Sequence, residues 1–311
     1  MKIGKIVGLF IMLSLLVAVT STSCKNNGSN TTSPAYTSEE NVKERKTANA
    51  VYLYKFEDWK NEDRISELSK LGINDVFLSI YAKNLPGEVY YSSDYTQKLI
   101  DFIVKAYAKN IYVHLMSIQT YDSGKTENHA DALERIKSVI NFCKTIPETP
   151  CKGINIDIEP HALDEWKNAN EFNDGVRENL MKQFVELLSK INSLIKGSDG
   201  LPSLQFSADI GWWWNEKFKD GLLPSGDINI LARYLDFVAP MAYSTAVDIL
   251  EQAGDEITAM PTMIAIQVDN FSSYNDVIKE IESLNSKFKD NDNYLGVVIF
   301  KFATLKEKAD S

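Results

Sequence analysis

From residue 50 to the C-terminus the chain alternates between short apolar runs and longer segments that have one apolar face. The short runs are rich in β-branched and aromatic residues, which is typical of strands. The longer segments place apolar residues three or four positions apart, as at Leu180, Phe184, Leu187 and Leu188, which predicts amphipathic helices. The pattern predicts strands at 50–55, 75–81, 111–118, 153–159, 204–210, 237–243, 262–267 and 296–302.

Eight strands, most of them followed by a helix, imply a parallel sheet with both faces covered. Eight such units in about 260 residues favour an α/β fold of the closed (β/α)8 type, a TIM barrel. Only one helix fits between the last two strands, so we expect a single domain without a large insertion subdomain. An open doubly wound sheet is the alternative, although no GxGxxG or GxxxxGK[ST] motif follows any strand.

The N-terminal residues do not share this alternation. Lys2 and Lys5 precede an apolar stretch at 6–19, and small polar residues follow it, which is the order of a secretory signal. The segment resembles bacterial lipoprotein signals, in which cleavage precedes a cysteine that becomes acylated. That cysteine is Cys24 here, although Ser21 replaces the leucine usual three residues before it. An ordinary cleaved signal and an uncleaved anchor are the alternatives.

The segment after Cys24 is polar, rich in Asn, Ser and Thr, and lacks an apolar period, so it predicts a flexible tether. The expected organisation is a signal peptide at 1–23, a tether at 24–49 and a barrel domain at 50–311. It predicts a lipid-anchored protein of the bacterial cell envelope, at the outer membrane or the cell surface. Its contact with the membrane would be through the anchor alone.

The amino-acid composition limits which partners and cofactors the protein is expected to bind. The formal charge is −10 and the isoelectric point about 5.0, which disfavours nucleic acid as a partner. The three cysteines and three histidines show no CxxC or HxxxH spacing, so we expect no metal and no other cofactor. Cys143 lies on an apolar helical stripe and is expected to be a buried thiol. A disulfide between Cys143 and Cys151 stays an open alternative.

One predicted strand is unusual for a barrel. Its period of two places one set of residues, Ile154, Ile156 and Ile158, opposite another, Asn155, Asp157 and Glu159. If the isoleucines face the helices, the three polar side chains point into the barrel, where unpaired carboxylates are costly. Pro160 ends the strand and places Glu159 at the carboxyl-terminal mouth, where the active sites of barrels lie.

Asp157 is expected one layer below Glu159, with their backbones about 6.5–7 Å apart, so that its charge helps Glu159 keep a proton near neutrality. A carboxyl group that is still protonated near neutrality can act as a general acid. The alternatives without function are a carboxylate pair bonded to Lys or Arg, and a row that faces solvent.

At these positions the chain resembles glycoside hydrolase family 18, the chitinases and endo-β-N-acetylglucosaminidases, whose fourth strand carries DGxDxDxE. The segment KGINIDIE at 152–159 keeps the Gly, the last Asp and the Glu, whereas Lys152 and Asn155 replace the first two Asp residues. The resemblance implies that Glu159 is the acid/base. It implies that Asp157 orients the 2-acetamido group of the substrate, which acts as the nucleophile in a retaining, substrate-assisted mechanism.

A second segment, LDFVAPMAYS at 235–244, is similar to the family's sixth-strand pattern of DFV followed by MxYD. The resemblance implies that Tyr243 donates a hydrogen bond to the acetamido oxygen and that Met241 lines the sugar pocket. Ser244 stands where the family has an acid. Further substrate-binding candidates are Asn155 and residues placed by strand parity or position, namely Asp209, Trp213, Tyr54, Tyr81, Met116 and Gln267.

The roles of several tryptophan and histidine residues are ambiguous in the sequence. The indoles of 212–214 follow the fifth strand and could stack on sugar rings, or pack beneath a loop. His161 lies in the loop beyond Glu159 and is expected to be a surface histidine, whereas His114 is expected to be a satisfied core residue.

Two classes of function remain open. One is hydrolysis of glycans that contain N-acetylglucosamine, for which Asp157, Glu159 and Tyr243 argue. The other is a catalytically weak or inactive glycan-binding protein on the same scaffold, for which Lys152 and Asn155 argue. A hydrolase of another family, acting on sugars without an acetamido group, is a third alternative.

Overall fold

The computed structural model describes residues 47–80, 93–146, 151–169, 175–198, 203–219, 228–243 and 246–311. Its strands are β1 (Ala48–Leu53), β2 (Asp75–Ser79), β3 (Tyr112–Ile118), β4 (Cys151–Ile156), β5 (Gln205–Ile210), β6 (Phe237–Pro240), β7 (Thr262–Gln267) and β8 (Tyr294–Phe300). The α-helices are α1 (Phe56–Trp59), α2 (Arg64–Lys70), α3 (Ser93–Tyr107), α4 (His129–Thr145), α5 (Asp164–Asn168), α6 (Gly175–Lys196), α7 (Trp214–Lys217), α8 (Asn229–Ala232), α9 (Ala246–Ala259), α10 (Tyr274–Lys287) and α11 (Phe302–Asp310). Short 3-10 turns are η2 (Tyr121–Gly124), η3 (Thr126–Asn128), η4 (Pro160–Ala162) and η6 (Val268–Asn270).

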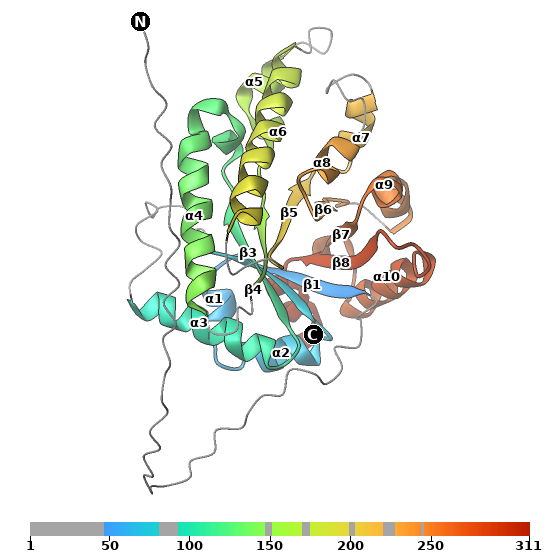
Figure 1. The fold of residues 1–311 in the computed structure, drawn as a ribbon. Helices are drawn as coiled ribbons and strands as arrows, with labels where there is room; N and C mark the ends of the chain where they lie inside the picture. Colours follow the sequence, from blue (N-terminus) through green and yellow to red (C-terminus); the bar gives the residue numbers. More distant parts are fainter. Residues whose placement is uncertain are drawn as a thin grey trace, which may run out of the picture. The chain divides into compact units, whose positions relative to one another are not determined.

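The strands form a closed parallel barrel in chain order, β1 to β8, and helices surround it (Figure 1). Closure pairs β8 with β1, so that Ala48 lies opposite Gly296. Gly296 has φ +121°, and a Cβ there would lie 2.0 Å from the Ala48 carbonyl oxygen. Only glycine therefore fits the seam. The fold confirms the predicted single-domain (β/α)8 barrel.

Two apolar layers follow from strand alternation. The outer layer, between the barrel and the helices, contains Ile154, Ile156 and Ile158. The inner layer fills the barrel and includes Tyr52, Phe77, Met116, Phe237, Met263 and Val298. The predicted facing of the isoleucine row is therefore confirmed, and the side chains between these isoleucines belong to the interior.

Several strands end before the predicted position. β4 ends at Ile156 instead of residue 159, because the chain turns into η4 at Pro160, although the Asp157 amide still donates to the Ile118 carbonyl at 2.8 Å. β6 ends at Pro240 instead of residue 243, because the chain turns there. The Ala242 amide donates a hydrogen bond to the Pro240 carbonyl, and the Tyr243 amide donates one to the Met241 carbonyl. β1 begins at Ala48, slightly before the predicted boundary at residue 50.

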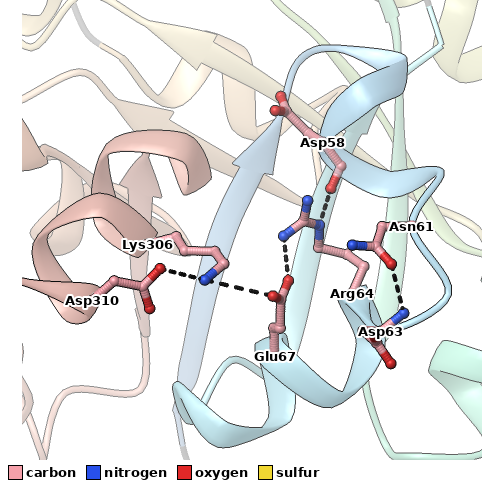
Figure 2. Close-up of polar contacts among 7 residues, drawn as sticks. All are labelled: Asp58, Asn61, Asp63, Arg64, Glu67, Lys306 and Asp310. Carbon is pink, nitrogen blue, oxygen red and sulfur yellow. Dashed lines mark hydrogen bonds and ion pairs between the residues drawn. The ribbon is translucent and has the colours of Figure 1, made fainter.

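The last helix is joined to the first part of the barrel by a polar cluster around Arg64 (Figure 2). The Arg64 guanidinium donates to the Asp58 carbonyl, pairs with Glu67 and lies 4.1 Å from the Phe302 ring centroid in α11. Lys306 of α11 reaches Glu67 of α2 at 3.5 Å. Charge pairing and packing thus link α2 to α11.

The predicted signal peptide, the lipid attachment site Cys24 and the tether up to residue 46 lie outside the described residues, as does Tyr81. Among the helices that the structure does describe, none combines the length and apolar character needed to cross a bilayer.

Candidate active site

The end of β4 carries the polar row into the barrel. Asn155 is fully buried, whereas Asp157 and Glu159, beyond the end of the strand, are half-buried. Gly153 allows β4 to pass close to its neighbours, since a Cβ there would lie 2.8 Å from His114 Nδ1 and 2.9 Å from the Gln205 carbonyl oxygen. The glycine of the sequence motif is therefore required by packing at the barrel floor.

Asp209, from β5, joins this row from the neighbouring strand. Its Oδ1 accepts hydrogen bonds from the Tyr52 hydroxyl at 2.8 Å and from Asn155 Nδ2 at 3.3 Å. Asn155 Nδ2 also donates to Ser207 Oγ at 3.1 Å. β1, β4 and β5 therefore contribute one buried polar network, and Asn155 contacts a carboxylate from its inward position.

Three acids share one electrostatic environment. Burial, then the charges of Asp209 and Glu159, raise the pKa of Asp157 well above its usual range. Burial also raises the pKa of Asp209, to about 7, although its bonds from Tyr52 and Asn155 favour the charged form. Asp157 Oδ1 has no hydrogen-bond partner. Burial and neighbouring charge therefore favour the protonated form of both deeper acids, Asp157 and Asp209.

Aromatic side chains line the site above the acids. Tyr54, of the loop after β1, and Tyr243, of the segment after β6, each pack 5.4 Å from the Phe300 ring centroid. Burial raises the pKa of Tyr54 and of Tyr243, and Asp157, Asp209 and Glu159 all add to both increases. Both phenols are therefore held protonated beside the acids, and each has an O–H group to donate.

Glu159 lies at the mouth against His161. His161 Nε2 is 2.9 Å from Glu159 Oε2, and both side chains are about one-fifth exposed, at 21% and 22%. The His161 ring lies edge-on to Trp213, with ring centroids 5.1 Å apart. The Trp213 ring also packs against Trp166, with the ring centroids 6.1 Å apart. The predicted surface histidine is thus a direct partner of the candidate acid.

Two members of the tryptophan triplet lie in different surroundings. Trp214 is buried and packs against Phe184 and Phe218. Trp213 is half-buried beside His161 instead. One indole thus packs beneath the loop, and another borders the site.

The other substrate-binding candidates lie in different surroundings. Met116 has no exposed surface, belongs to the inner layer, lies opposite Asn155 and accepts a hydrogen bond from the Gln119 amide at its sulfur. Met241 is half-buried at the end of β6, bridged to Ala265 of β7. Gln267 donates to Asp269 at 3.5 Å, which is a contact with the turn after β7 instead of with the acids.

The two departures from the family motif lie at different depths. Asn155 belongs to the Asp209 network, whereas Lys152 lies at the opposite end of β4, with its Nζ 5.4 Å from the Tyr112 ring centroid. Lys152 lines a floor cavity of about 210 Å³ together with Asp75, His114 and Gln205. The lysine is therefore remote from the acids at the mouth.

Sequence reasoning missed three members of the site. Tyr52 lies two residues before Tyr54 on the same face of the strand, so it could have been found from Tyr54. Phe300 likewise lies two residues after Val298 and shares its inward face. Tyr121, in η2, is an exposed aromatic whose pKa is raised first by the charge of Glu159. Nothing in the sequence placed Tyr121 near residue 159, because η2 follows a different strand.

His114 is a buried core residue, as expected, stacked on Phe77 and 3.5 Å from Asp75 Oδ1, but it is not fully satisfied, since its Nδ1 has no hydrogen-bond partner among the described residues. Cys143 and Cys151 are both buried free thiols, so the alternative of a disulfide is not realised. No group of three or more metal-ligating side chains occurs within the described ranges.

No family model matches the chain, and no curated protein matches its sequence. Solved structures do match it. A GH18 chitinase from Pseudoalteromonas aurantia has a TM-score of 0.57 at 13% identity, covering 85% of this chain and 99% of its own. A glycoside hydrolase family 5 enzyme from Prevotella bryantii has a TM-score of 0.52 at 11% identity, with coverages of 83% and 88%.

A mannanase from Bacillus subtilis has a TM-score of 0.52 at 13% identity, covering 84% of this chain and 82% of its own. At such identities these likenesses show a shared (β/α)8 fold. The three proteins are named as glycoside hydrolases or as a mannanase, and they do not single out family 18.

Proposed function

We propose that the protein is a glycoside hydrolase that cleaves glycans containing N-acetylglucosamine, by a retaining, substrate-assisted mechanism. The observation that carries the proposal is the meeting of Glu159, Asp157 and Tyr243 at one barrel mouth. The charges of both acids help to raise the pKa of the Tyr243 phenol, which supports the proximity of the three groups. The catalytic residues of barrel enzymes come from the ends of several strands at this face.

In the proposed reaction, Glu159 gives its proton to the glycosidic oxygen as the bond to the anomeric carbon breaks. The acetamido carbonyl oxygen of the same sugar attacks that carbon and forms a cyclic oxazolinium ion. Water then opens the ring and loses a proton to the Glu159 carboxylate, which restores the acid. No enzymic nucleophile is needed, and the configuration at the anomeric carbon is retained.

Asp157 and Tyr243 would hold the acetamido group. Tyr243 keeps its phenolic proton, since burial raises its pKa, and can donate to the carbonyl oxygen. Asp157 Oδ1 is unpartnered and can accept from the acetamido N–H. A buried oxygen without a partner is costly unless a ligand supplies one, which supports a substrate amide at this position.

The aromatic residues support a carbohydrate ligand. Tyr54 lies near the acids, Phe300 packs against Tyr54, and Trp213 packs against the His161 ring that contacts Glu159. Aromatic faces stack on the apolar faces of sugar rings. The shared fold with glycoside hydrolases agrees with this substrate class. Binding without turnover is the second candidate, and the replacement of a motif acid by Asn155 favours it.

A screen of the purified barrel domain tests the proposal. We expect release of reducing ends from one of three classes, namely chitin oligomers, N-glycans or peptidoglycan fragments. A thiazoline that mimics the cyclised acetamido intermediate should inhibit competitively. Hydrolysis that the thiazoline does not inhibit would exclude the substrate-assisted route, and binding without release of reducing ends would favour the second candidate.

We further propose that the enzyme acts at the bacterial envelope, held by an acyl group on Cys24. The basic and apolar N-terminal segment followed by a cysteine supports this location. Metabolic labelling with palmitate tests it: wild-type protein should incorporate label, and Cys24→Ala should not. Labelling of the Cys24→Ala protein would exclude this anchor.

A further inference from the structure

His161 touches the proposed acid from within a turn that fixes both residues. Glu159 precedes η4, and the Ala162 amide donates to the Glu159 carbonyl at 2.9 Å, which closes the turn. Pro160 is buried at the first position of η4, where its ring restricts φ. Residues two apart in sequence therefore lie side by side, and His161 Nε2 lies 2.9 Å from Glu159 Oε2.

The His161 ring has little freedom to leave this position. It lies edge-on to Trp213, at 5.1 Å and 80°, and edge-on to Trp214, at 6.1 Å and 85°. Trp214 is 1% exposed and packs against Phe184 of α6. Through Trp214, His161 thus connects the helical layer to the carboxyl group of Glu159.

The surroundings of the ring also select its tautomer. His161 Nδ1 is buried and has no hydrogen-bond partner. A proton on Nδ1 would place a buried N–H group without an acceptor, which is unfavourable. A single ring proton on Nε2 avoids that loss and donates to Glu159 Oε2.

We infer that His161 is a positioning residue that acts through Glu159, as a neutral Nε2–H donor that occupies Oε2 and leaves Oε1 to carry the proton given to the substrate. The inference rests on the proposed function, since it assigns His161 to the same general acid. Directing the proton to one oxygen matters because proton transfer requires the donor oxygen within hydrogen-bond reach of the leaving group.

Two variants separate this role from simple packing. His161→Phe keeps an aromatic ring against the tryptophans and removes the donor, whereas His161→Gln loses the ring and can place an amide N–H near the position of Nε2. On the glycan cleaved by the wild-type protein, we expect the Phe variant to lose about 10–100-fold in kcat with little change in KM. We expect the Gln variant to recover most of that loss.

A residue needed only for packing gives the opposite order, with the Phe variant active and the Gln variant impaired, and that order would overturn the inference. Equal activity of wild type and the Phe variant would overturn it as well. Thermal melting of each variant separates loss of fold from loss of turnover. A wild-type protein without any hydrolysis would instead remove the proposed function.

Nitrogen-15 NMR of the imidazoles tests the contact without any substrate. The chain has 3 histidines, so comparison with His161→Gln assigns the His161 signals. We expect the neutral imidazole of His161 to carry its proton on Nε2, and its signals to change in Glu159→Gln. A neutral ring with its proton on Nδ1, or signals unaffected by Glu159→Gln, would contradict the inference.

Discussion

The buried carboxyl group of Glu256, outside the active site, should make folding stability depend on pH. Glu256 belongs to α9, which packs against β6 and β7, and it is fully buried. Within the described part of the chain, neither of its carboxyl oxygens has a hydrogen-bond partner. Burial raises its pKa from 4.5 to about 8. Glu256→Gln keeps the size of the side chain and removes its ionisation.

The size of the effect follows from linkage. At pH 4 the group is mostly protonated in both the folded and the unfolded chain, so its ionisation contributes little. Between pH 4.5 and 8 the unfolded chain ionises and the folded chain does not, so the folded state loses stability as pH rises. At about 1.36 kcal/mol for each pH unit above 4.5, the loss at pH 7 is about 3 kcal/mol.

The assay is thermal or denaturant unfolding of wild type and Glu256→Gln at pH 4 and pH 7. The gain from the substitution should be about 3 kcal/mol larger at pH 7 than at pH 4, or ~6–12 °C in Tm. Glu282→Gln, at an exposed position in α10, is the matched control and should show no such difference. A gain of the same size at both pH values would refute the reasoning.

Three further predictions concern Asp209, the two glycines Gly296 and Gly72, and Arg64. Asp209→Asn should lower turnover and raise the unfolding temperature more at pH 8 than at pH 4, because burial raises the pKa of Asp209 to about 7; an equal Tm change at both pH values would contradict this. Gly296→Ala should lower the free energy of unfolding by more than about 3 kcal/mol. Gly72→Ala, where the added Cβ meets no atom within 4 Å, should lower it by about 1 kcal/mol. Equal losses would contradict the conclusion that only glycine fits where β8 pairs with β1. Arg64→Ala should cost about 2–3 kcal/mol in denaturant unfolding, because it removes the buried guanidinium that pairs with Glu67, donates to the Asp58 carbonyl and packs on Phe302, and leaves Glu67 with Lys306 alone. A loss below about 0.5 kcal/mol would contradict the role of the cluster.

The fold could be predicted because strand and helix periods differ and repeat. The alternation at β4 predicted that its isoleucines face the helices, because an alternation of apolar and polar residues has only one favourable register in a barrel. Strand ends were less predictable. The chain leaves β4 at Ile156 and β6 at Pro240, where prolines and turn bonds, and not side-chain patterns, decide the path.

Residues on one strand could be grouped from parity, but contacts between strands could not. Asn155 and Asp209 were both expected to be inward, yet their hydrogen bond and its extension to Tyr52 depend on the register of β1, β4 and β5. The partnership of His161 with Glu159 was missed because it depends on the geometry of η4 and on packing against Trp213. Such contacts require coordinates.

The most direct measurement of the central claim is the activity of Glu159→Gln, with glycan affinity measured beside it. The substitution keeps the shape of the side chain and removes the proton that would be given to the glycosidic oxygen. The account predicts that release of reducing-end sugar falls at least about 100-fold while the Kd for the glycan stays within a few-fold of wild type. Turnover equal to that of wild type would contradict it.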